Sequence, residues 1–259
     1  MPGCGVAGPH GGGAVGEVIP GSIRIAPAAF DALAAYGIGG LAVAVAAAFV
    51  LLFSRGRPAR RLALSAATAV VMAGSAAAAS SGLLARFDRL PPPMLVMIVA
   101  VFATGFAVGL SRTGADAAAE VPLAVLVGLQ AFRLPLELVM HRAATLGIMP
   151  VELSYSGYNF DIVTGLGAAL LATAMQAGWR VPRSVIWAWN VWGFWCLAVI
   201  AVIAVTTAPM VRLFGDEPRH LNTWVLFFPY VWLPVVLVTV ALAGHITVAR
   251  ALRRGSHPV

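Results

Sequence analysis

Four polar side chains recur at helical spacing in an otherwise apolar stretch, at Gln130, Arg133, Glu137 and His141. At about 100° per residue they fall within an arc of roughly 80° on one helix. Ionisable residues inside a membrane segment mark functional sites by default. We therefore expect Glu137 to carry a proton, with Arg133 as its charge partner or as an anchor for an anionic group. A structural alternative is an i,i+4 ion pair between Arg133 and Glu137.

A second polar group follows in the connection that ends at Asp161, which contains Glu152, Tyr155, Tyr158 and Asn159. Asp161 begins the next helix and shares a face with small residues, which suit close contact with a neighbouring helix. Asn159 or Asp161 is equally suited to capping that helix. The combined prediction is one polar pocket for a ligand or a proton, formed by Arg133, Glu137, His141, Asn159 and Asp161.

Metal and cofactor chemistry find little support in the sequence. Glu137 and His141 have helical ligand spacing, and Asp161 could join them from the next helix. A familiar ligand set would need a further histidine, which only His220 in an outer loop could supply. His245 is expected about 30 Å away, at the far end of its helix. We predict no metal and no cofactor. The 17 basic residues are all arginine, and the missing lysine excludes a retinal or pyridoxal Schiff base and a Walker A loop.

The composition indicates a membrane protein rather than a soluble domain. Of 259 residues 60% are hydrophobic and 10% charged, against about a quarter charged in soluble domains. A membrane helix needs about 20 mostly apolar residues. Seven runs qualify, and they predict an all-α, multi-pass bundle of seven transmembrane helices at residues 32–53, 62–84, 94–111, 121–141, 160–178, 185–207 and 224–249.

Arginine placement predicts the orientation of the bundle. With the N-terminus outside, ten arginines lie in cytoplasmic segments and six in outer ones, with the densest group between Ser54 and Arg61. The positive-inside rule then favours N-out and C-in. The expected surroundings are the lipid bilayer of a bacterial cytoplasmic (inner) membrane, with a membrane partner protein as an option and no nucleic acid.

The chain divides into three expected regions: a flexible Gly/Pro-rich tail at 1–29, the transmembrane domain at 30–254 and a short cytoplasmic tail at 255–259. Cys4 in the tail and Cys196 in an apolar run are not expected to form a disulfide. Gly105 and Gly109, at the spacing that lets helices approach closely, predict tight packing.

Aromatic residues and prolines give two further expectations. Trp187 and Trp189 are expected to anchor their helix at the membrane interface, and the deeper Trp192 and Trp195 to face lipid or pack against neighbouring helices. Pro229 and Pro234 are expected to kink the last helix in its outer half.

A resemblance to a known group rests on three stretches, Phe132–Leu138, Tyr158–Ile162 and Thr164–Gly165. Here the chain resembles a group of uncharacterised multi-spanning bacterial membrane proteins. The resemblance implies the membrane class and assigns no role to any residue.

Three functions remain open at this stage. The first is binding and transport of a small molecule or a proton through the predicted polar pocket, open to the outside. The second is a membrane-embedded enzyme in which Glu137 or His141 is a general base. The third is a scaffold or accessory subunit of a membrane complex, whose polar stripe docks a partner helix.

Overall fold

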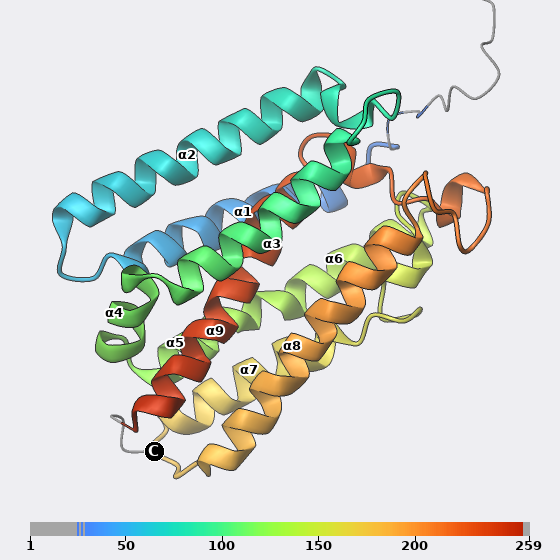
Figure 1. Ribbon diagram of the computed structural model, residues 1–259. Helices are drawn as coiled ribbons and strands as arrows, with labels where there is room; N and C mark the ends of the chain where they lie inside the picture. The colour runs from blue at the N-terminus through green and yellow to red at the C-terminus, as the bar shows by residue number, and fades with distance from the viewer. Residues whose placement is uncertain (1–24, 26, 28, 256–259) are drawn as a thin grey trace, which may run out of the picture.

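A computed structural model describes residues 25, 27 and 29–255, and these residues form an all-helical bundle without strands (Figure 1). The expected tails at 1–29 and 255–259, and Cys4 with them, lie almost wholly outside these residues. The α-helices are α1 (Ala32–Phe53), α2 (Pro58–Ser80), α3 (Pro93–Leu110), α4 (Arg112–Glu120), α5 (Leu123–Leu129), α6 (Arg133–Thr145), α7 (Asp161–Gln176), α8 (Arg183–Thr206) and α9 (Thr239–Arg254).

Short tight turns and one wide turn complete the helical structure. The 3₁₀ turns are η1 (Leu83–Ala85), η2 (Gln130–Phe132), η3 (Val151–Leu153), η4 (Pro218–His220) and η5 (Trp224–Leu226). A π-helical segment, η6 (Leu233–Val238), runs directly into α9. Because α5, η2 and α6 also follow one another without a break, Leu123–Thr145 and Leu233–Arg254 each act as one long helix.

Six helices in the described ranges are long and apolar enough to cross a membrane. They are α1, α2, α3, the α5–α6 helix, α8 and the η6–α9 helix. The run predicted at 160–178 forms α7, which has 16 residues and is therefore about 24 Å long. That is shorter than the roughly 30 Å hydrocarbon core of a bilayer. The chain thus has the helices of a membrane protein, with α7 as its short member.

The last helix begins later than the sequence predicted. Residues 224–232 form η5 and irregular turns, and the long helix starts at Leu233. Pro229 therefore lies before the helix and cannot kink it, while Pro234 lies in the π-helical segment, where the regular hydrogen-bond ladder is already altered. His245 is consequently about 18 Å from the helix start, near its middle, so its predicted place at the far end was wrong.

The η6–α9 helix is the centre of the bundle. It packs on α3, α4, α5 and α8, and Figure 1 shows it crossing between them. Leu242 and Ile246 of α9 lie against Gly105 and Gly109 of α3, where an added Cβ would be within 3 Å of their side chains. The close helix packing predicted from this glycine pair is confirmed.

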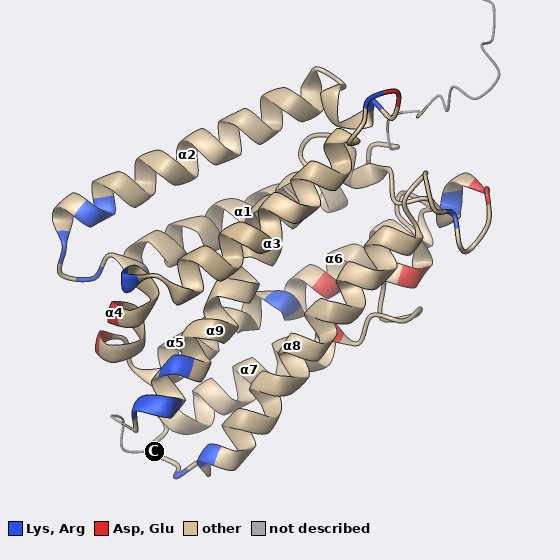
Figure 2. Cartoon of the chain, viewed as in Figure 1, with Lys and Arg blue, Asp and Glu red and all other residues tan. Residues whose placement is uncertain are grey.

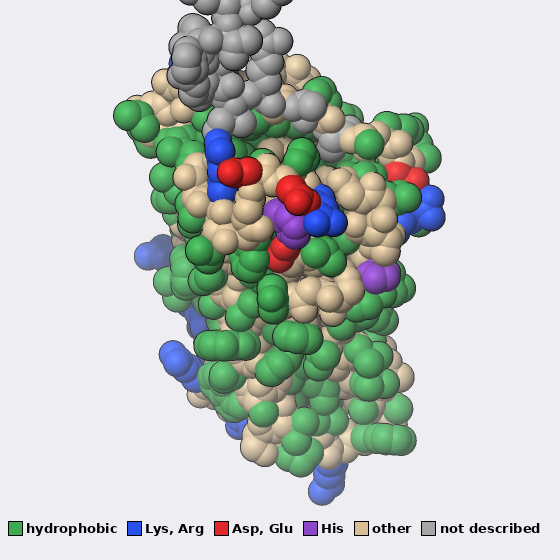
Figure 3. Space-filling model, turned by 90° about the vertical axis from the view of Figure 1, so that its right-hand side faces the viewer, with side chains coloured by type: hydrophobic (Ala, Val, Ile, Leu, Met, Phe, Trp, Pro, Cys, Tyr) green, Lys and Arg blue, Asp and Glu red, His purple; other side chains and the backbone are tan. Residues whose placement is uncertain are grey.

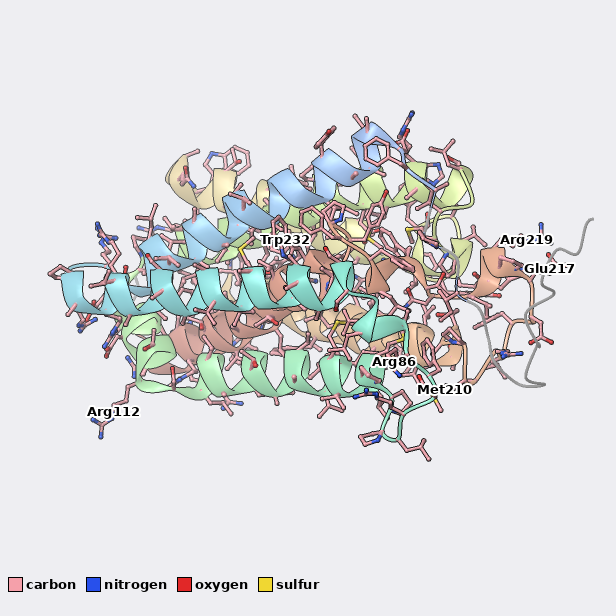
Figure 4. All side chains as sticks on the ribbon, turned by 90° about the horizontal axis from the view of Figure 1, so that it is seen from above. Arg86, Arg112, Met210, Glu217, Arg219 and Trp232 are labelled. Carbon is pink, nitrogen blue, oxygen red and sulfur yellow. The ribbon has the colours of Figure 1, made fainter. Side chains whose placement is uncertain are left out.

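Helix α2 lies at the edge of the bundle. Of its 23 residues only Ala79 is buried, although Trp232 donates a hydrogen bond to the carbonyl oxygen of Met72 at 3.0 Å (Figure 4). A pocket of about 1000 Å³ lies between the first half of α1, the end of α2 and the segment before η6, with an aromatic and apolar lining that includes Tyr36. Contacts with α1, η1 and η6 hold α2 in place, and most of its surface stays exposed.

Charge is distributed between the two ends of the bundle. One end, here called the arginine-rich end, comprises the α1–α2 connection, α4, the α7–α8 connection and the end of α9 (Figure 2). Arg57 pairs there with Glu120 at 2.5 Å and Arg60 with Asp116 at 2.7 Å. At the opposite end, Arg142 pairs with Asp31. In Figure 4, Arg112 lies at one end, and Glu217 and Arg219 lie at the other.

Hydrophobic side chains cover much of the surface between these ends. On the face drawn in Figure 3, charged side chains lie toward the top and along the left and bottom edges, with hydrophobic ones between them. Many large apolar residues are exposed, among them Leu62, Val70, Leu170 and Trp195. Such a surface would aggregate in water and is suited to lipid.

Candidate functional site

Arg133 enters the bundle just after the 3₁₀ turn η2, where α6 begins. Pro135 has no amide hydrogen, and its ring would clash with the carbonyl four residues earlier in a regular helix. The chain tightens to the 3₁₀ turn η2 just before this point. Arg133 then becomes the first residue of α6, and its side chain is 1% exposed. The proline thus fixes the place where a charged side chain is turned into the protein.

The partner of Arg133 is Asp161, the first residue of α7. Its Oδ1 accepts a hydrogen bond from Arg133 Nη1 at 2.6 Å, and the Asp161 side chain is 5% exposed. Gly165, one turn along α7, permits this contact, because a Cβ there would overlap the backbone of Leu134. The i,i+4 ion pair between Arg133 and Glu137, considered as a structural alternative, is not formed: the guanidinium pairs with a carboxylate on the next helix instead.

Glu137 is held by an amide side chain. Asn159 Nδ2 donates to Glu137 Oε1 at 2.8 Å and to the carbonyl oxygen of Leu153 at 2.9 Å. Asn159 Oδ1 accepts from the backbone amide of Asp161 at 3.0 Å, so this side chain satisfies the first amide of α7 although Phe160 is at the N-cap position. This single side chain fixes the start of α7 and the orientation of Glu137 together.

These residues line one small cavity of about 30 Å³. One water molecule needs about 10 to 15 Å³ on this measure, so the space suits roughly two waters. Its walls are otherwise apolar and come from α6, α8, η6 and α9. Three buried polar atoms of the cluster have no hydrogen-bond partner within the described structure: Arg133 Nε, Arg133 Nη2 and Glu137 Oε2. The cavity therefore offers both a donor and an acceptor to a small guest.

The structure brings together four of the five residues predicted for the pocket, Arg133, Glu137, Asn159 and Asp161. Arg133, Glu137 and Asn159 are each 1% exposed, and Asn159 comes from the segment between α6 and α7. The outward opening of the pocket stays a prediction.

His141 lies outside this lining. Its Nδ1 is 3.3 Å from the hydroxyl of Ser154, and its ring stacks on Tyr155 with centroids 4.4 Å apart. His220 contacts Glu152 instead, with 2.5 Å between Nδ1 and Oε1. The considered cluster of Glu137, His141 and His220 is not assembled. Across the described ranges, no three His, Cys, Asp or Glu side chains are placed to hold a metal ion.

Sequence reasoning missed a polar contact between α8 and α9. His245 and Asn190 are both fully buried and are joined by a bond of 2.8 Å between Nδ1 and Oδ1. The error followed from the predicted start of the last helix, which placed His245 at the wrong depth. The prolines were the available signal for a later start. Pro229 disfavours helical backbone at the residue before it, and Pro234 lies in the first turn of the segment, where proline is favoured.

The tryptophans of α8 follow the predictions only in part. Trp189 is buried and donates through Nε1 to the carbonyl oxygen of Thr164 at 3.0 Å. Its predicted interfacial role was wrong because Gly167 of α7 makes room for the ring. Trp192 and Trp195 are 38% and 63% exposed, so they point outward on the apolar surface of the bundle.

A comparison with known families covers the whole region that builds the cavity. Residues 90–253, more than half of the chain, match a family described as "Domain of unknown function (DUF8737)". The chain belongs to this family. The DUF8737 region takes in α3 to nearly the end of α9, including every residue that lines the cavity, while α1 and α2 precede it. No curated protein and no solved structure matches the chain.

Proposed function

We propose that this DUF8737 protein binds a proton at Glu137 and carries protons, alone or coupled to a small polar solute, across a bacterial cytoplasmic membrane. The observation that supports this is a buried carboxyl oxygen, Glu137 Oε2, that has no partner among the described residues and belongs to the cluster around a water-sized cavity. Ionisable groups in such surroundings are typical of proton relays in membrane proteins.

Glu137 is better placed than Asp161 to exchange a proton. Asp161 has the guanidinium of Arg133 as its counter-ion at 2.6 Å. Protonating Asp161 would leave a buried arginine charge unpaired, which is strongly unfavourable. The hydrogen-bond partner of Glu137 is the neutral amide of Asn159. Glu137 can therefore gain or lose a proton while the arginine and aspartate stay paired.

The size of the cavity favours a proton over a larger cargo. About 30 Å³ admits water but no metabolite. Coupling to a small solute would require the segment between α6 and α7 to move and the cavity to widen. The alternatives of an enzyme and a scaffold gain no specific support, because His141 is bonded to Ser154 away from the cavity lining.

The proposed orientation is N-out and C-in. The arginine-rich end would be cytoplasmic by the positive-inside rule. Glu137 is then 14 residues, or about 21 Å, from the cytoplasmic start of its helix. Since the helix has 23 residues, Glu137 would lie in the outer half of the membrane. Protons would reach it from the periplasm.

Proton flux into proteoliposomes tests the proposal. The purified protein is reconstituted with a trapped pH dye, and a potassium gradient with valinomycin sets the membrane potential. Wild-type vesicles should acidify faster than empty ones, and Glu137→Gln should reduce the rate to that of empty vesicles. Glu120→Gln is a matched control, because Glu120 pairs with Arg57 at the bundle surface. Equal flux in wild type and Glu137→Gln would overturn the proposal.

A further inference from the structure

A second polar cluster lies deep in the bundle, apart from the residues that line the cavity at Glu137. It consists of His245 on α9, Asn190 on α8 and Gln130 in η2, and all three are 0% exposed. Burying polar groups costs free energy unless their hydrogen bonds are made. Here they are made only in part, since Gln130 Oε1, Gln130 Nε2 and His245 Nε2 have no partner in the described part of the chain.

The contacts of Asn190 determine which nitrogen of His245 carries hydrogen. Asn190 Nδ2 donates to the backbone carbonyl of His245 at 3.3 Å, which leaves Oδ1 as an acceptor. Oδ1 lies 2.8 Å from His245 Nδ1. In a neutral imidazole one nitrogen is a donor and the other an acceptor. Nδ1 must therefore be protonated, and Nε2 presents a lone pair.

The surroundings hold the imidazole in this orientation. Trp189 and Phe194 lie on it with ring centroids at 5.3 Å each. Gly193 lies so close that a Cβ there would overlap the ring at Cε1 and Nε2. The contact between α8 and α9 is thus shaped around the imidazole, and the position of its basic nitrogen is fixed.

Gln130 lies on the same long helix as Glu137 and beside the neighbour of His245. Its amide nitrogen packs against Gly244, the neighbour of His245, closely enough that a Cβ at Gly244 would overlap it. Gln130 is also seven residues before Glu137, or about 11 Å along the helix, with Arg133 between them. A glutamine amide can donate to and accept from water. Unpartnered polar atoms therefore occur at successive depths from Glu137 to His245.

We propose that His245 Nε2 is a second proton-binding site, which takes the proton from Glu137 through water held at Gln130 and passes it toward the arginine-rich end. This inference rests on the proposed function of Glu137. The proton leaves the Glu137 carboxyl, which becomes a carboxylate, and binds Nε2, which makes His245 an imidazolium. The imidazolium then releases it to water. The charge of Arg133, which lies between the two sites, stays balanced by Asp161 throughout.

The flux assay described above tests this second site with one substitution and one matched control. His245→Asn keeps a donor in the place of Nδ1 for Asn190 and removes Nε2. Thr247→Val removes a buried hydroxyl from the same turn of α9, and that hydroxyl bonds only to the carbonyl of Ala243. We expect His245→Asn to lower proton flux to the level of empty vesicles and Thr247→Val to leave the flux unchanged.

The two proposals fail in different ways. Flux that is lost in Glu137→Gln and intact in His245→Asn would overturn the second site and leave the first standing. Proton flux that is unchanged in Glu137→Gln would overturn both proposals.

Nitrogen-15 NMR of histidine-labelled wild-type protein in lipid does not depend on the folding of any variant. It should show His245 as the Nδ1-protonated tautomer at alkaline pH, and a neutral His245 protonated on Nε2 would also overturn the inference.

Discussion

At the scale of single residues, the cost of burying charge explains why the cluster has four members. A buried ion pair at best roughly offsets its desolvation, and removing one partner costs about 3 to 5 kcal/mol. Arg133 and Asp161 balance each other's charge, and Asn159 forms hydrogen bonds with both Glu137 and the first amide of α7. Glu137 is the member whose charge is unmatched, and this sets it apart from the structural residues around it.

Asp31 gives a prediction of pH dependence at this scale. The hydrogen bond from Arg142, followed by that from the amide of Ala34, lowers the pKa of Asp31 from 3.8 to about 2. A carboxyl with a lowered pKa in the folded state stabilises that state above its unfolded pKa. The contribution of Asp31 should therefore be complete above pH 3.8 and be lost as the pH falls toward 2.

Thermal unfolding of wild type and Asp31→Asn in mild detergent, followed by circular dichroism, checks this expectation. The difference in Tm between the two proteins should be constant at neutral pH and shrink as the pH falls below 3.8. A difference that grows on acidification would contradict the assigned role of Arg142.

At the scale of elements, the site depends on how closely α6 and α7 approach. The small face of α7 was predictable from the spacing of Asp161, Gly165 and Ala168, and all three are buried. The partner of that face was not predictable, since periodicity gives the buried side of a helix but not its neighbour. The start of the last helix was misjudged for a related reason. Residues 224–232 are apolar enough to look like the first turns of a membrane helix, yet Pro229 prevents a continuous helix there.

Gly165→Ala should damage the protein more than an equivalent change elsewhere. The new Cβ would overlap Leu134 and the carbonyl carbon of Arg133, so α6 and α7 must separate. Overpacking of this kind costs about 1 to 3 kcal/mol. Gly74→Ala is the matched control, because nothing lies within 4 Å of a Cβ at that position. Unfolding in a denaturing detergent should show lower stability for Gly165→Ala alone, and equal stabilities would contradict this packing.

At the scale of the whole molecule, composition and hydropathy sufficed to predict an all-helical membrane protein. Six of the seven predicted runs form helices of membrane length. The sequence placed Arg133 and Asp161 in one predicted pocket but did not predict that they pair with each other. Arg133 is 28 residues from Asp161, and only the fold brings them together. His245 and Asn190 are 55 residues apart. Because His245 was predicted at the wrong depth, its contact with Asn190 was not predicted.

The orientation of the molecule can be measured by thiol labelling. Cys4 and Cys196 are first replaced by serine, and single cysteines are introduced as Arg55→Cys and Glu217→Cys. These positions lie at opposite ends of the bundle. In intact bacterial cells whose outer membrane has been made permeable, a membrane-impermeant reagent should label position 217 and not position 55. The reverse pattern would contradict the N-out, C-in orientation.

The central claim is that Glu137 itself binds and releases a proton inside the bundle. Infrared difference spectroscopy of the protein in lipid, between acidic and alkaline buffer, measures this through the carbonyl stretch of protonated carboxyl groups. Wild type should show a band that is missing in Glu137→Gln and retained in Glu120→Gln. Identical carboxyl spectra for wild type and Glu137→Gln would contradict the account.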